Sequence, residues 1–122
     1  GGGLPTKEQI AAFIKKTSMG VMATAARGMV RDAIDSFVNN DPALAKKILA
    51  SDDMIDDFDR EIFGLMMQEM KRDSKLIEPA AHMMIVSRHI ERLADHATNI
   101  AEDVIFLVNA KIIKHNTDEP AI

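Results

Sequence analysis

Apolar residues recur at spacings of three and four positions through three long segments of the chain, and this periodicity constrains the fold more than any other feature. The spacing places apolar side chains on one face of an α-helix, and the alternation typical of β-strands is absent. Glycine and proline are scarce after residue 5, and the polar stretches "VNNDP" and "RDSK" separate the segments. The sequence therefore predicts an all-α protein.

The first segment begins at a predicted capping box, in which the side chains of Thr6 and Gln9 each bond to the other residue's backbone N–H. Gly20 and Gly28 weaken the helix, so we expect a bend or break between Thr17 and Gly20. The predicted apolar positions of this segment are Ile10, Phe13, Ile14, Val21, Met22, Met29, Ile34 and Phe37.

The second segment runs from Pro42 to about Arg72, with Asp41 as the predicted N-cap and Pro42 as a first-turn proline. We expect one continuous helix here. Its apolar stripe comprises Leu44, Ala45, Ile48, Leu49, Ile55, Phe58, Ile62, Leu65 and Met66.

The third segment starts after a cap at Asp73 or Ser74 and runs to about His115. Pro79 either lies in the first turns of this helix or marks a delayed start. The apolar stripe is close to a heptad pattern and comprises Val86, Ile90, Leu93, Ala97, Ile100, Val104 and Leu107.

Three long helices with short connections predict an antiparallel up-down-up three-helix bundle over residues 6–115. Residues 1–5 are expected to be a disordered start or one added by cloning, and residues 116–122 a loose tail. The chain lacks an initiator Met, which suggests a fragment.

Composition excludes several classes of protein. The chain has no cysteine, so disulfides and thiol-based metal sites are excluded. Its net charge is −4 without a basic stripe, which argues against nucleic-acid binding. We find no membrane-spanning run, signal peptide, phosphate-binding glycine loop or nucleophile motif, and we expect a cytoplasmic protein that is not an enzyme.

Acidic residues gather at two places. In "SDDMIDDFDRE", Asp52 and Asp56 lie four residues apart, and on the third helix Glu91 and Asp95 have the same spacing. Such pairs project from one face of a helix and repel each other. We expect the acids of the second segment to lie too deep in their helix for the N-terminal dipole to stabilise them. Further acids and one amide accompany them: Asp53, Asp57, Asp59, Asn99 and Glu102.

Two interpretations of these acids stay open. Carboxylates spaced by four can converge on a hard cation, and pairs on adjacent helices would form a site with four or more carboxylates. Alternatively, the acids form a solvated face that is balanced by Arg60, Arg88 and Arg92. A ferritin-like site is excluded because the sequence contains no ExxH pair, and His96 is more typical of a polar surface residue than of a ligand.

The stretch "RHIERLADHATNIAEDVIFLV", followed by "IIKH", resembles the signature helix of the PhoU family, whose pattern is close to ERxGDHxxNIAE. "SDDMIDDFDREI" resembles the DxxxD segment of that family, and "GVMATAARGMVRDAIDSFVNND" fits its first helix. The chain departs from the pattern at Ala94, where glycine is usual, and at "NAK" before the final histidine. The matching residues of the third helix are Glu91, Arg92, Asp95, His96, Asn99, Ile100, Ala101 and Glu102.

The resemblance implies a non-enzymatic regulator of bacterial phosphate uptake. PhoU-like proteins couple the ATPase of the phosphate ABC transporter to a sensor histidine kinase and repress the phosphate-starvation response. Some bind a multinuclear iron or zinc cluster, and by position the ligands here would be Asp52, Asp56, Glu91 and Asp95, with Asn99 and Glu102 as additional candidates. Family members usually hold two three-helix repeats, so this chain would be a C-terminal half or a single repeat that forms a homo-oligomer.

Three alternatives accompany this hypothesis. The chain is a structural helical adapter with a solvated acidic face, a carboxylate-bridged di-metal enzyme, or a PhoU-like domain detached from a different phosphate regulator.

Overall fold

The computed structural model describes residues 4–118, and no strand occurs within this range, which confirms the all-α prediction. The helices are α1 (Lys7–Lys16), α2 (Met19–Val38), α3 (Pro42–Ala50), α4 (Asp52–Arg72), the short 3-10 helix η1 (Ser74–Leu76) and α5 (Ile77–Asp118). None of the helices between residues 4 and 118 is both long and apolar enough to cross a membrane.

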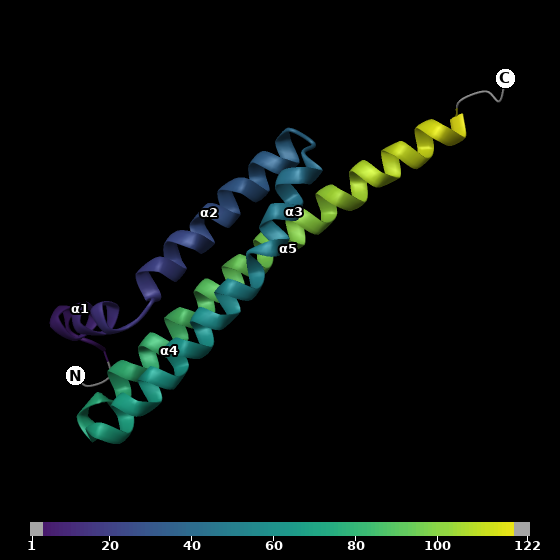
Figure 1. Ribbon diagram of the computed structural model, residues 1–122. Coiled ribbons are helices and arrows are strands. Elements are labelled where there is room, and N and C mark those ends of the chain that lie inside the picture. The colour runs from purple at the N-terminus through teal and green to yellow at the C-terminus, as the bar shows by residue number, and fades with distance from the viewer. Residues whose placement is uncertain (1–3, 119–122) are drawn as a thin grey trace.

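The long helix α5 forms the spine of the molecule (Figure 1). α2 runs along it in the same direction, while α3 and α4 follow each other and return in the opposite direction. α2, α3 and α4 all pack against α5, and α1 lies at the beginning of α2. The C-terminal part of α5 extends past the other helices in Figure 1.

The predicted helix starts are confirmed by their hydrogen bonds. The Thr6 N–H donates to Gln9 Oε1 at 3.0 Å, and the Gln9 N–H donates to Thr6 Oγ1 at 3.2 Å, which is the capping box of α1. Asp41 accepts from the Leu44 N–H at 3.1 Å, and Asp73 accepts from the backbone N–H two residues later at 3.0 Å. Polar caps satisfy N–H groups that a helix start leaves without partners.

The first segment breaks where the sequence predicts, between α1 and α2. Thr17 leaves the helical conformation, and its hydroxyl donates to the Phe13 carbonyl at 2.8 Å and accepts from the Met19 N–H at 3.3 Å. The side chain thus satisfies backbone groups on both sides of the break. Gly20 lies after it, and a Cβ atom there would meet no other atom within 4 Å.

The second segment is not one continuous helix, and that prediction is wrong. A single turn residue, Ser51, separates α3 from α4. Its N–H donates to the Ile48 carbonyl at 3.0 Å, three residues back, and its hydroxyl donates to the Lys47 carbonyl at 3.2 Å. This tighter turn ends α3, so α4 begins at Asp52.

The third segment follows its prediction except at its end. Pro79 lies in the first turn of α5, where its missing N–H costs no helical hydrogen bond. α5 continues to Asp118, so residues 116–118 are helical rather than loose. Residues 1–3 and 119–122, which belong to the predicted disordered start and loose tail, lie outside the described residues.

The buried core confirms the predicted stripe of the second segment and only part of the other two, of which Phe13, Met22, Met29, Ala97 and Val104 are buried. Ala45, Ile48, Ile55, Ile62 and Met66 are buried. Seven residues of the other predicted stripes are exposed instead: Ile14, Val21, Ile34, Phe37, Val86, Leu93 and Leu107. The positions that α2 and α5 bury are Met19, Met22, Ala26, Met29, Ala33, Ser36, Ala80, Met83, Ser87, Ala94, Ala97, Thr98, Ala101 and Val104.

Side-chain size explains this error. Many of the buried positions of α2 and α5 carry alanine or serine, whose small side chains allow helices to pack closely. The predicted stripe on α5 favoured large side chains and therefore lies partly one position away from the true one. Ala94, the departure from the family pattern, is fully buried.

Candidate functional site

α4 and α5 bring three predicted site residues together. One carboxylate oxygen from each of Asp52, Asp56 and Asp95 lies within 4.8 Å of the other two. Asp52 and Asp56 are one helical turn apart on α4, and Asp95 faces them from the neighbouring α5. All three side chains are half-buried. We call these three residues the aspartate cluster.

Burial and repulsion by neighbouring acids disfavour the charged forms of Asp52 and Asp56. The pKa of Asp52 is raised above its ordinary value by burial first and then by the charges of Asp56 and Asp95. Burial also raises the pKa of Asp56, followed by the charges of Asp95 and Asp53, while Arg60 opposes the shift. The cluster therefore holds negative charge at an energetic cost unless a cation or a proton compensates it.

The remaining predicted residues lie around the cluster rather than within it. Glu91 is half-buried, and its pKa is raised by burial and then by a hydrogen bond with Asp95 and the charge of Asp95. Asn99 and Glu102 are exposed. The charge of Glu102 still contributes to the raised pKa of Asp52, as the weakest of its causes.

The donor set fits a hard divalent cation. Such ions are bound by several oxygen ligands, and the cluster offers three carboxylates, with Glu91 beside them. Asp52 Oδ1 is buried and has no hydrogen-bond partner among the described residues. A buried oxygen without a partner is costly, and a cation is one group that would satisfy it.

The start of α4 changes one step of the sequence argument. Because α4 begins at Asp52, both Asp52 and Asp53 lie in its first turn, where the helix dipole favours negative charge. The expectation that these acids lie too deep for the dipole is wrong for this pair. It remains correct for Asp56, which lies beyond the first turn of α4.

The arginines are mostly engaged with other acids. Arg60 pairs with Asp57 at 2.7 Å, and Arg88 pairs with Asp59 at 3.0 Å. Within residues 4–118, Arg92 forms no ion pair. The arginines that a solvated acidic face would use for balance therefore do not pair with the aspartate cluster, although the charge of Arg60 reaches Asp56.

A buried polar contact beside the cluster is absent from the sequence prediction. The Ser87 hydroxyl donates to Asp59 Oδ1 at 2.6 Å, and Arg88 Nε forms an ion pair with the other oxygen of Asp59 at 3.0 Å. Asp59 and Ser87 are both buried. Their place on the buried stripes, four residues after Ile55 and after Met83, was the available signal, because a polar residue on such a stripe needs a polar partner.

The fold and the site together define a helical-bundle protein with a carboxylate cluster between two long helices. The chain belongs to the PhoU family, because the model of the PhoU domain matches residues 20–104, which include the aspartate cluster.

Curated relatives carry the same name in several bacteria. The chain is 35% identical over 82 residues to the phosphate-specific transport system accessory protein PhoU homolog of Xylella fastidiosa, which covers 67% of the chain and 35% of the relative. The corresponding protein of Zymomonas mobilis is 33% identical over 97 residues, covering 80% of the chain and 41% of the relative. The corresponding protein of Aquifex aeolicus is 37% identical over 94 residues, and the match covers 77% of the chain and 42% of the relative. The chain thus spans less than half the length of these relatives.

Proposed function

We propose that the chain is part of an accessory protein of a phosphate-specific transport system. The observation that carries this proposal is the PhoU domain match over residues 20–104, together with relatives that bear that name. The protein acts in the cytoplasm as a regulator rather than an enzyme. It docks on the ATPase of the phosphate transporter and on a sensor histidine kinase, and it represses the phosphate-starvation response.

Docking requires exposed surface rather than a catalytic cleft, and the bundle offers long helical faces. The outer faces of α2 and α5 carry exposed apolar side chains, among them Ile34, Phe37 and Leu107. Exposed apolar residues that are grouped on one face are typical of protein–protein contact sites.

The test uses full-length protein, purified transporter ATPase and purified kinase in a binding assay. We expect saturable binding to at least one of the two. A starvation-response reporter in cells without the gene should stay active in high phosphate and be repressed when the gene is restored. Binding to neither partner, or an unchanged reporter, would contradict the proposal.

We further propose that the aspartate cluster, with Glu91, binds iron or zinc. The supporting observations are the three convergent carboxylates, the raised pKa values of Asp52 and Asp56, and the unpartnered buried oxygen of Asp52. The two helices hold the carboxylates close together before a cation binds, so the metal site is preformed. A bound ion would cross-link α4 to α5 and stabilise the surface around the cluster.

Calorimetric titration of metal-free protein with Zn²⁺, or with Fe²⁺ under anaerobic conditions, tests whether the aspartate cluster binds a cation. Saturable binding should disappear after Asp52→Asn with Asp56→Asn and persist after Asp103→Asn, a matched change at an exposed acid of α5. Equal binding by both variants would contradict the site. The acids would then form a solvated face of a helical adapter.

A further inference from the structure

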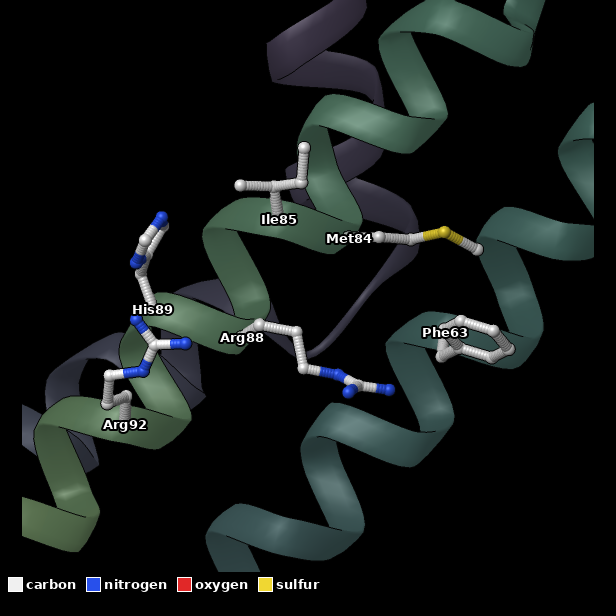
Figure 2. Close-up of a pocket in the computed structure, with 6 residues that line it drawn as sticks. All are labelled: Phe63, Met84, Ile85, Arg88, His89 and Arg92. Atoms are coloured by element: carbon white, nitrogen blue, oxygen red, sulfur yellow. The ribbon is translucent and has the colours of Figure 1, made fainter.

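A second concave site lies between α4 and α5 and has the opposite charge (Figure 2). It is a groove of about 440 Å³ lined by Phe63, Met84, Ile85, Arg88, His89 and Arg92. Phe63 comes from α4, and the other five come from α5. We call it the basic groove. No carboxylate is among these described lining residues, although the chain as a whole is acidic.

The apolar part of the groove is exposed. Ile85 is 54% exposed and Phe63 is 43% exposed, and Met84 lies between the two helices beside them. Large apolar side chains in a concavity favour a partner that inserts apolar side chains of its own.

The cations of the groove differ in how they are held. Arg88 is fixed by Asp59, which also accepts from Ser87, and its guanidinium lies 5.6 Å from the centre of the Phe63 ring. Arg88 lines both this groove and the neighbouring pocket that contains Asp56 and Glu91, so its side chain lies between the two. The charge of Arg88 is balanced by that of Asp59 in their ion pair.

Arg92 supplies the charge that remains for a partner, and His89 lies beside it with a ring that can form hydrogen bonds. Both are exposed, and within residues 4–118 neither has an ion pair. In Figure 2 they project from one side of α5, whereas Arg88 projects toward α4 and Phe63. Ile85, His89 and Arg92 follow the spacing of one helical face, which an approaching helix can contact along its length.

From these observations we propose that the basic groove binds an amphipathic helix of another protein whose apolar face is flanked by Asp or Glu. Its apolar side chains pack on Phe63, Met84 and Ile85, and its carboxylates pair with Arg92 and accept a hydrogen bond from the ring of His89. The surface is distinct from the aspartate cluster, and this inference does not depend on the proposed function.

Two other ligand classes fit the groove less well. Inorganic phosphate needs several donors that converge on one point, but the cations diverge around α5 and the floor between them is apolar. An anionic membrane favours a convex apolar surface, and the acids beyond Arg88 would be repelled by it.

The test is fluorescence anisotropy with a labelled synthetic helix of about four turns, with leucines at helical spacing and glutamates on both flanks. Two control peptides replace the glutamates with lysine or the leucines with serine. We expect saturable binding of the acidic peptide that weakens with salt, and about tenfold or greater weakening with either control peptide.

Substitutions locate the binding on the chain. Ile85→Asp and the pair His89→Glu with Arg92→Glu should each weaken binding at least about tenfold. Val21→Asp and Arg27→Glu are matched controls on α2 and should leave binding unchanged, because Val21 lies outside the groove and is exposed at 61%, close to the 54% of Ile85. Circular dichroism must show the same helix content in every variant.

The proposal would be overturned if the peptide did not bind saturably, or if the groove variants bound it as well as the unaltered chain. It would also be overturned if millimolar inorganic phosphate displaced the peptide. The same holds if the chain bound phosphatidylglycerol vesicles more tightly than the peptide and Arg92→Glu abolished that vesicle binding. A concentration-dependent dimer that the same variant dissociates would also overturn it, since the groove would then hold a second copy of the chain.

Discussion

Asp56→Asn should stabilise the metal-free protein at neutral pH, although it removes a charged residue from a half-buried site. Asp56 faces Asp52 and Asp95, whose nearest oxygens lie within 4.8 Å. At that distance two unit charges repel by about 0.9 kcal/mol at the dielectric constant of water and by about 3.5 kcal/mol at an effective value of about 20. Like charges one turn apart on an exposed helix cost only about 0.2–0.5 kcal/mol.

The cluster lies between these limits because it is half-buried and can take up protons. We therefore expect a gain of about 1 kcal/mol in the free energy of unfolding. The assay is urea unfolding at pH 7 and low salt with a chelator, because urea does not screen charge. Added salt should reduce the gain.

Asp57→Asn provides the control on the next residue of the same helix. Asp57 is exposed and pairs with Arg60 at 2.7 Å, so its loss should cost about 0.3–0.5 kcal/mol. The two substitutions are chemically identical and should have opposite signs. A loss of stability in Asp56→Asn, or a gain that salt does not change, would refute the electrostatic account of the cluster.

Three further predictions concern pH, glycine and packing. The raised pKa values of Asp52, Asp56 and Glu91 let the folded state hold more protons, so the metal-free protein should gain stability as pH falls from neutral to mildly acidic. Urea titrations should show a smaller gain in Asp56→Asn, because that variant keeps only the contributions of Asp52 and Glu91. Gly64→Ala should raise the free energy of unfolding by about 0.5–1 kcal/mol in the same assay, because a Cβ there meets no atom within 4 Å beyond the neighbouring backbone of its own helix. A lower free energy of unfolding would contradict the absence of a steric clash at this position. Ala97→Leu should cost about 1–3 kcal/mol or more, because Ala97 is fully buried, and unchanged thermal stability would contradict the packing of α5.

The pH prediction has a lower limit. Hydrogen bonds with Arg72 and Lys16 lower the pKa of Glu69 in the folded state, so this contribution is lost as the pH falls through that lowered value. Below about pH 4, where unfolded carboxylates take up protons, stability should therefore fall again.

The sequence predicted helix starts better than helix faces. Thr6, Asp41 and Asp73 cap helices through contacts within a few residues, and local signals of this kind are visible in a sequence. The interruption at Ser51 was not predictable in the same way, because its backbone stays close to helical values and serine is common within helices. The buried face of α5 was partly missed because close helix contacts use alanine, which a search for large apolar residues does not rank.

The acidic site shows the same division between local and long-range information. The spacing of Asp52 and Asp56 places them on one face, and the resemblance to a family paired them with Asp95 across two helices. The bond between Ser87 and Asp59 depends on the register between α4 and α5, which neither helix encodes alone. The basic groove depends on that register too, since Phe63 meets Arg88 only after the helices pack.

The metal content of untagged protein, measured by mass spectrometry, tests the central claim about the aspartate cluster most directly. The measurement compares the unaltered sequence with an Asp52→Ala, Asp56→Ala variant and a Glu91→Ala, Asp95→Ala variant. We predict near-stoichiometric iron or zinc that disappears in both variants, because α4 and α5 each contribute ligands. Metal-free protein, or metal that both variants retain, would contradict a cation site between α4 and α5.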